Sequence, residues 1–322
     1  MMVGVALSLH LMGCSQDHGP STVAPARPLA SLAESPPQDD ASSPTSAPAL
    51  PRADTAREAV QLLRKRVDAG DVQATCQLAR ELEFCANAEA NNHQLGMIAA
   101  RINADQEAAL NRNDILQTMA ELAKVRGEYC EGMPALSSTE SVAMWRRAAM
   151  RGHLPSMMYY GSGLSFPQDR LLDVLDELKV FRRDGVEVMK RVAQSGNLQA
   201  NLLLARAYAP RNSGPNRTPL LRQAVQPDAA QSLGYYLLAQ QLQRTSASTS
   251  VSALGLETEA KGLRMIMSPD EVAEGERRFA ELQRLVVPTS AAQFDPVAQA
   301  DLDSRQPVPG TELCERDEFL LQ

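Results

Sequence analysis

Five cysteines are the residues of this chain whose chemistry is easiest to define: Cys14, Cys76, Cys85, Cys130 and Cys314. Cys14 ends a short uncharged segment at the start of the chain, and the others lie farther along it. These four are an even number, which in an exported protein predicts two disulfides with three possible connectivities. Four reduced thiols are the alternative. The sequence has no Cys-x-x-Cys motif, so a thioredoxin-like redox site is not indicated.

Histidines and paired carboxylates offer weaker candidates for chemistry. His153 follows a glycine, where a turn residue is expected more than a catalytic base, and His93 lies in a polar Asn-Asn-His segment typical of a cap or a surface. Neither has metal-ligand spacing to the cysteines. Glu128 and Glu131 could form a glycosidase pair, but a solvated helix end explains them better. No zinc-protease, serine-hydrolase or phosphate-loop motif occurs, so we expect no catalysis, metal or cofactor.

Composition favours packed helices and argues against nucleic acid as a partner. The 322 residues include 32 basic and 39 acidic side chains, giving a formal net charge of −7. Nucleic-acid-binding proteins usually carry a basic excess. Only 4% of the residues are aromatic, whereas 44% are hydrophobic, so the core must depend on Ala, Leu, Val and Met. That composition suits helices better than strands.

The first 13 residues contain no Asp, Glu, Lys or Arg. Their apolar run is too short to span a bilayer, but it has the length of a signal-peptide core. It ends in Leu11-Met12-Gly13-Cys14, which resembles the lipobox of bacterial lipoproteins. That resemblance implies that residues 1–13 are removed and that Cys14 is acylated. Ser15, which is not an Asp, implies sorting to the outer membrane, with the protein on the periplasmic face.

Residues 14–54 are expected to form a disordered tether. The segment is rich in Pro, Ser and Ala and contains no aromatic residue. Such a composition cannot bury enough apolar surface to offset the entropy of ordering. Its prolines make it an extended spacer between the lipid and the folded body.

Residues 55–287 show helical spacing of apolar side chains. Val60, Leu63 and Val67, for example, recur at steps of three and four. The segment Ser268-Pro269-Asp270-Glu271 has the pattern of a capping box, with a proline at the first helical position. We therefore expect an all-α body, followed by a tail over residues 288–322.

Three segments align without gaps, and their first glycines are 82 and 44 residues apart. Each has a glycine, a polar residue and then a small residue: Gly70, Asp71 and Ala74; Gly152, His153 and Ser156; Gly196, Asn197 and Ala200. Glycine suits a left-handed helix end, and the small residue allows the next helix to approach closely. The spacing indicates repeats of about 40 residues, which are typical of helical solenoids.

The segment Met144–His153 closely resembles the end of a Sel1-like repeat, a relative of the tetratricopeptide repeat. Residues 125–134 resemble the opening element of that repeat. The resemblance implies a right-handed α-solenoid of helix-turn-helix units, interrupted by an insertion at about 86–120. It also implies an adaptor that presents an extended surface to partners.

The repeat architecture leads to a disulfide prediction. Cys85 and Cys130 end matching helices of consecutive units, and stacked helices run side by side, so we predict a Cys85–Cys130 disulfide. Cys76 and Cys85 would be about 13 Å apart on one helix, beyond disulfide reach. Cys76–Cys314 then remains, and it would hold the C-terminal tail on the body.

Two pairs of tyrosines are candidates for partner contact: Tyr159 with Tyr160, and Tyr235 with Tyr236. On solenoid helices they would line the concave surface, and Tyr is enriched at binding hot spots. Trp145, the single Trp, could be a ligand platform, but its helical phase favours a position in the core.

These observations favour a lipid-anchored adaptor of the bacterial cell envelope that binds an unidentified protein or peptide. The membrane contact would come from the N-terminal lipid. A peptidoglycan-binding or cell-wall-processing accessory factor is the alternative from another class. A purely structural lipoprotein is the third.

The Cys14→Ser substitution removes the thiol that would be acylated. We expect the variant to leave the membrane fraction, because several acyl chains on one residue supply most of the affinity. Fractionation of cells producing either form measures this. Retention of the variant in the membrane would show that Cys14 is not the anchor.

Overall fold

A computed structural model describes residues 49–104, 112–133, 138–210, 220–245, 253–287, 306–317 and 319–320. The signal segment, Cys14 and most of the tether lie outside these residues, so their predicted roles remain predictions.

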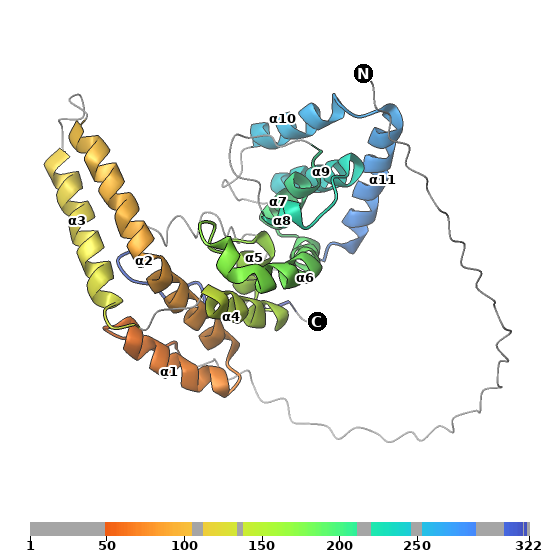
Figure 1. The fold of residues 1–322 in the computed structure, drawn as a ribbon. Coiled ribbons are helices and arrows are strands. Elements are labelled where there is room, and N and C mark those ends of the chain that lie inside the picture. Colours follow the sequence, from red (N-terminus) through yellow and green to blue (C-terminus); the bar gives the residue numbers. More distant parts are fainter. Residues whose placement is uncertain are drawn as a thin grey trace, which may run out of the picture. The chain divides into compact units, whose positions relative to one another are not determined.

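The described part of the chain is helical, which confirms the all-α prediction (Figure 1). The helices are α1 (Ala56–Asp68), α2 (Val72–Ala104), α3 (Arg112–Tyr129), α4 (Ser138–Met150), α5 (Leu154–Ser162), a 3-10 turn η1 (Leu171–Val174), α6 (Leu175–Gln194), α7 (Leu198–Tyr208), α8 (Leu220–Gln223), α9 (Ala229–Thr245), α10 (Ala253–Arg264) and α11 (Pro269–Leu285). Within the described ranges, extended pairing is confined to one bridge between His153 and Phe319.

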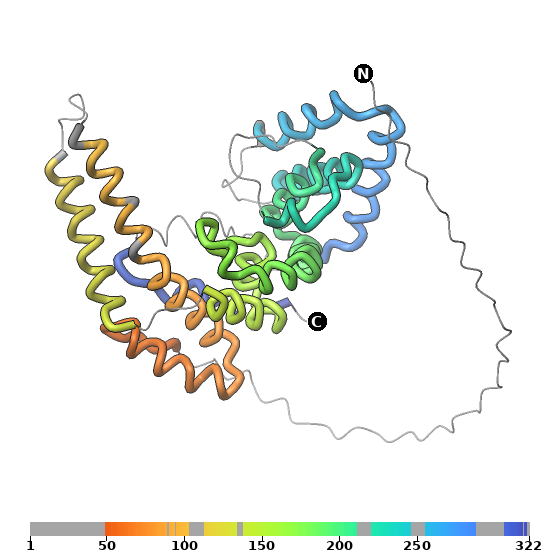
Figure 2. The backbone as a smooth tube through the Cα atoms, viewed as in Figure 1, coloured from red at the N-terminus to blue at the C-terminus, as the bar shows by residue number. Residues whose placement is uncertain are grey.

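Most helices pack on neighbours that are close in the chain. The contacts run from α1 to α2, from α2 to α4, and then in order through α5, α6, α7 and α9, which carries α10 and α11 (Figure 2). The core is mainly aliphatic, with Leu63, Met157 and Leu204 among its fully buried side chains, and it also includes aromatic residues such as Trp145 and Phe181. The C-terminal segment adds contacts between the end of the chain and the first helices.

The predicted insertion is an extension of two helices. Helix α2 continues for 33 residues, and α3 packs beside it (Figure 1). Cys85 is bonded to Cys130, and the Asn92 side chain donates a hydrogen bond to the Ala123 carbonyl. These pairs show that the two helices are antiparallel.

The three glycine junctions share one backbone conformation. Gly70, Gly152 and Gly196 have φ values of 90°, 85° and 81°, as a left-handed helix end requires. The next residue caps the following helix in two of them: Asp71 accepts from the Ala74 amide at 2.9 Å, and Asn197 from the Ala200 amide at 2.8 Å. The small residues Ala74, Ser156 and Ala200 are fully buried. The sequence alignment thus corresponds to a recurring local structure.

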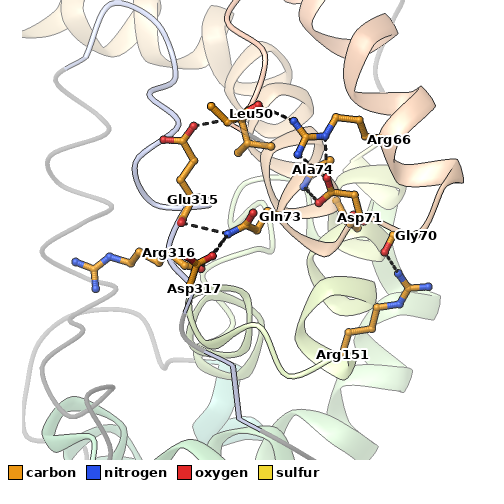
Figure 3. A network of polar contacts seen from close by, with 12 residues as sticks. Leu50, Arg66, Gly70, Asp71, Gln73, Ala74, Arg151, Glu315, Arg316 and Asp317 are labelled. Atoms are coloured by element: carbon orange, nitrogen blue, oxygen red, sulfur yellow. Dashed lines mark hydrogen bonds and ion pairs between the residues drawn. The ribbon is translucent and has the colours of Figure 1, made fainter. Parts of the chain in front are cut away.

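The C-terminal segment, residues 306–317 with 319–320, crosses the first helices, and we call it the C-terminal strap. Cys314 is bonded to Cys76, with Cα atoms 5.6 Å apart, and Leu320 donates its amide to the Gly152 carbonyl at 2.8 Å. Gln73 donates to the Glu315 carbonyl at 3.1 Å and to Asp317 at 2.8 Å (Figure 3). The strap is therefore fixed at several points.

Residues 49–54 belong to the folded body, which corrects the predicted end of the tether. Leu50 is buried, and its amide donates to Glu315 of the strap at 3.0 Å (Figure 3). Arg66 donates to the Ala49 carbonyl at 2.7 Å. Proline content could not show that the strap offers a partner for these residues.

Gly152→Ala should destabilise the fold, because φ is positive there and an added Cβ would collide with the Leu320 carbonyl oxygen. We expect a loss of about 1–3 kcal/mol in the free energy of unfolding. Gly127→Ala is the matched control: it lies inside α3 with open space around it, so Ala should be neutral or stabilising by about 1 kcal/mol. Urea unfolding measures both. Equal stability of the two variants would contradict the junction geometry.

Candidate functional site

A cavity of about 180 Å³ lies where α2, α3, α4 and α5 meet the C-terminal strap. We call it the Trp145 cavity. Its lining residues are Arg80, Glu83, Phe84, Asn87, Asn91, Arg126, Trp145, Tyr159, Leu164 and Pro309. Arg80, Arg126, Trp145 and Tyr159 are buried and form the floor, whereas the other six are half-buried and form the rim. The cavity therefore combines a buried floor with access from solvent.

One face of α2 supplies half of the lining. Arg80, Glu83, Phe84, Asn87 and Asn91 follow each other at steps that keep side chains on one side of a helix. The apolar stripe of α2, which includes Cys76, Ala79 and Leu82, lies beside this polar face and is fully or almost fully buried. Packing of that stripe fixes the rotation of α2 and aims the polar face into the cavity.

The aromatic part of the floor is a stacked pair. The Trp145 and Tyr159 rings lie 4.7 Å apart between centroids and are nearly parallel, at 8°. The indole Nε1 of Trp145 donates to Glu83 Oε2 at 2.8 Å. Trp145 is fully buried, so the prediction of a core position is confirmed, and it also borders the cavity.

Two arginines connect the cavity to the strap. Arg126 donates from Nε and Nη2 to the Gln306 carbonyl at 3.2 and 3.0 Å, and its guanidinium lies 5.8 Å from the centroid of the Phe84 ring. Arg80 donates to the Gly310 carbonyl at 2.6 Å. Burial lowers the pKa of Arg126 from its ordinary value, which is far above neutral pH. The guanidinium therefore stays charged inside the protein.

Glu81, the residue after Arg80 in α2, is a second carboxyl group in this region and is buried. Burial raises the pKa of Glu81, although Gln77 and Tyr129 each donate a hydrogen bond to it at 2.8 Å. Burial also raises the pKa of Tyr129, and the neighbouring Glu81 carboxyl adds to this effect. The Glu81 carboxyl group therefore accepts hydrogen bonds from two neutral donors, Gln77 and Tyr129.

The size of the cavity limits what it can hold. A dry protein cavity of about 150 Å³ accepts a benzene molecule. Drug-sized ligands occupy pockets of roughly 300 Å³ or more. The Trp145 cavity therefore fits one side chain or an equivalent small group, and not a dinucleotide or a flavin.

The four tyrosines predicted to line an exposed concave surface are all buried, and of the four Tyr159 alone lines the Trp145 cavity. Their exposed fractions are 5% for Tyr159, 0% for Tyr160, and 2% for Tyr235 and Tyr236. Tyr159 stacks on Trp145, and Tyr235 stacks on Tyr208 with ring centroids 6.0 Å apart. They stabilise packing between helices and do not form an exposed surface.

Tyr160 and Tyr236 each donate a hydrogen bond to a carboxylate that also pairs with an arginine. The Tyr160 hydroxyl donates to Asp184 at 2.7 Å, and Arg146 forms an ion pair with the same carboxylate at 2.8 Å. Farther along the chain, Tyr236 donates to Glu259 at 2.7 Å, and Arg206 pairs with Glu259. Each carboxylate satisfies a phenol that would otherwise be buried without a partner, a large cost for a polar group.

Both predicted cysteine pairings are present: Cys85 with Cys130 and Cys76 with Cys314. The Cα atoms of the first pair are 5.5 Å apart, within ordinary disulfide range. Cys76 and Cys314 are fully buried. The pairs are those predicted, but Cys85 lies inside the 33-residue α2 and not at a helix end, and α2 and α3 are antiparallel.

One histidine and the paired glutamates were predicted to be surface or helix-end residues, and the structure agrees. His93, Glu128 and Glu131 are exposed. In the described ranges, no group of three or more His, Cys, Asp or Glu side chains could hold a metal ion. None of the described helices is long and apolar enough to cross a bilayer.

A second depression of about 460 Å³ lies over α6, α7 and the segment before α9. Exposed side chains such as Arg182, Arg183 and Asp228 make up much of its lining, beside the half-buried Tyr208. It is wider than the Trp145 cavity but lacks a comparable buried floor. The convergence of buried polar and aromatic groups singles out the Trp145 cavity.

The sequence reasoning missed the arginines and asparagines of the cavity. Their signal was present in the helical spacing of Arg80, Glu83, Asn87 and Asn91. Such a stripe is also what a solvated helix face looks like. The strap and α3, together with α4 and α5, lie over that face and make it the wall of a cavity.

His153 is fully buried at the Gly152 junction. Its Nδ1 lies 2.8 Å from the Ser156 hydroxyl, and its ring is 5.4 Å from that of Phe319 in the strap. Burial lowers the pKa of His153 to about 4, against smaller opposing effects of the Arg316 carbonyl and the Asp317 carboxylate. The folded protein therefore contains the neutral imidazole, as a structural side chain and not as a surface base.

Acid should weaken the fold through His153. The unfolded chain binds a proton near pH 6.5, whereas the folded state binds it only near pH 4, so stability falls as the pH drops between these values. The full effect is about 3 kcal/mol. His153→Asn, chosen to match Asn197 at the equivalent junction, should remove this part of the pH dependence. Urea unfolding of both proteins from pH 7 to pH 4 tests this, and parallel pH profiles would contradict it.

Comparison of the chain with protein-family models, with curated proteins and with solved structures gave no match. The candidate site is therefore interpreted from its own geometry.

Proposed function

We propose that this chain is a lipid-anchored adaptor of the bacterial cell envelope that binds a protein or peptide and catalyses no reaction. In this proposal the helices form a right-handed solenoid of Sel1-like repeats. Cys14 carries the lipid on the periplasmic face of the outer membrane. One side chain of the partner enters the Trp145 cavity.

The Trp145 cavity is the observation that carries the binding role. Its floor contains the stacked Trp145 and Tyr159 rings beside two buried arginines that donate to strap carbonyls, and its rim residues are half-buried. Buried aromatic and arginine groups are typical of positions that supply most of the binding energy in an interface.

The two disulfides support the location. Such bonds persist mainly in oxidising compartments such as the periplasm. Two are present here, and one of them closes a separation of 238 residues. Export is also what the segment before Cys14 implies.

Site-specific photo-crosslinking in native envelopes tests the binding role. A photoreactive residue replaces Asn91 on the rim of the cavity, and the matched control replaces Gln283, an exposed residue of α11. We expect a discrete polypeptide to crosslink at position 91 and not at position 283. Retention of the protein on purified peptidoglycan, with no polypeptide crosslinked at position 91, would overturn the adaptor role in favour of a cell-wall-binding factor.

A further inference from the structure

The charged groups of the Trp145 cavity are engaged within the protein. Arg126, through Nε and Nη2, and Arg80 both donate to backbone carbonyls of the strap. Glu83 accepts the indole N–H of Trp145 at 2.8 Å. Each of these three charged side chains also makes a further interaction inside the protein. They therefore stabilise the cavity wall, and the chemistry of a ligand must match the other lining residues.

Two asparagines of α2 keep amide groups that no described residue binds. Asn87 and Asn91 are half-buried at the rim of the cavity. Asn87 Oδ1 accepts a hydrogen bond from Arg170 at 3.1 Å, whereas Asn87 Nδ2 donates to none of the described residues. The Asn91 side chain forms no hydrogen bond with the described part of the chain. The rim therefore offers neutral donors and one neutral acceptor.

The spacing of these two amides suits the backbone of a peptide. Asn87 and Asn91 are four residues apart on α2, which places their Cβ atoms about 6 Å apart. In an extended peptide, the backbone N–H and C=O groups of one edge recur every second residue, about 6.6 Å apart. A primary amide can donate to such a carbonyl and accept from such an N–H. The two side chains can therefore bind one edge of an extended peptide.

The rest of the lining offers apolar surface. Phe84, Leu164 and Pro309 are half-buried at the rim, and the stacked rings of Trp145 and Tyr159 belong to the floor. A dry cavity of about 150 Å³ accepts a benzene molecule, so the volume of about 180 Å³ fits one phenylalanine ring. The cavity thus combines an apolar space for one side chain with amides for the backbone beside it.

We propose that the Trp145 cavity binds an extended peptide, taking one apolar side chain of phenylalanine size and hydrogen-bonding the adjacent backbone through Asn87 and Asn91. This inference rests on the proposed function, because it names the part of the partner that enters the cavity. The partner is a polypeptide with an apolar residue in an extended segment, and it needs no charged side chain at this position.

The single tryptophan gives a direct readout of the cavity. Because Trp145 is the only Trp, its indole N–H gives the only indole signal in an NMR spectrum of the folded chain. The probe is N-acetyl-phenylalanine methylamide, in which one ring lies between two peptide amides. The matched alanine compound keeps both amides and lacks the ring. We expect saturable shifts of the indole signal with the phenylalanine compound and at least tenfold weaker binding of the alanine compound, because the buried ring is lost.

Two results would overturn the proposal without any mutation. Equal affinity for the phenylalanine and alanine compounds would show that no ring enters the cavity. An indole signal that the phenylalanine compound does not shift would show that the cavity does not take such a side chain. The matched compounds therefore keep the test decisive even where a variant fails to fold.

A variant then tests the part played by the backbone amides. Asn91→Leu should weaken binding of the phenylalanine compound about threefold or more, because at least one hydrogen bond is lost. Binding of ethylbenzene, which has the ring and no amide, should stay equal or become tighter. Gln283→Leu, the matched change at an exposed position of α11, should alter neither ligand. Equal weakening of both ligands by Asn91→Leu, or weakening of neither, would contradict the proposed role of Asn91.

The crosslinking experiment separates this inference from the adaptor role. A polypeptide that crosslinks at position 91 while the phenylalanine compound fails to bind would leave the adaptor role standing and remove the apolar side-chain site. Selective binding of the phenylalanine compound without any crosslinked polypeptide would support the site and remove the adaptor role.

Discussion

The bond between Cys76 and Cys314 ties the last residues of the chain to its second helix, and much of the described structure depends on it. Both cysteines are fully buried, and 238 residues separate them. In a chain-entropy account, a crosslink over so long a loop stabilises the fold by about 5 kcal/mol. It also brings backbone carbonyls of the strap to Arg80 and Arg126, whose burial would otherwise be costly. Leu50, at the start of the folded body, uses the same strap as its partner.

This dependence explains why a local helical architecture contains an interior polar site. Helices that pack on their chain neighbours bury one stripe each and leave the opposite face to solvent. The polar face of α2 would be such a solvated face. The strap and α3 cover it, so the same side chains become the wall of a cavity. In our proposal, the binding site is formed where the strap, fixed by the Cys76–Cys314 bond, meets helices that otherwise pack on their chain neighbours.

Helical content, the capping box at Ser268 and the three glycine junctions could be predicted because they are local. Both disulfide pairs agree with the prediction, but the meeting of helix ends on which it depended does not occur, because Cys85 lies inside the long α2. The burial of Tyr160 and Tyr236 could not be predicted, because it depends on Asp184 and Glu259, carboxylates on other helices that satisfy the phenols. The cavity could not be predicted either, because helical phase gives the direction of a side chain but not what lies opposite it.

Hydrogen exchange of wild type and the Cys76→Ser/Cys314→Ser double variant tests the central role of the strap most directly. Peptides covering 306–317 and 76–91 report on the strap and on the cavity face of α2, and peptides covering α9 and α11 serve as the internal reference. We expect faster exchange in the strap and the cavity face of the variant, with unchanged protection in α9 and α11. Unchanged protection of the strap would contradict the claim that this disulfide holds the cavity together.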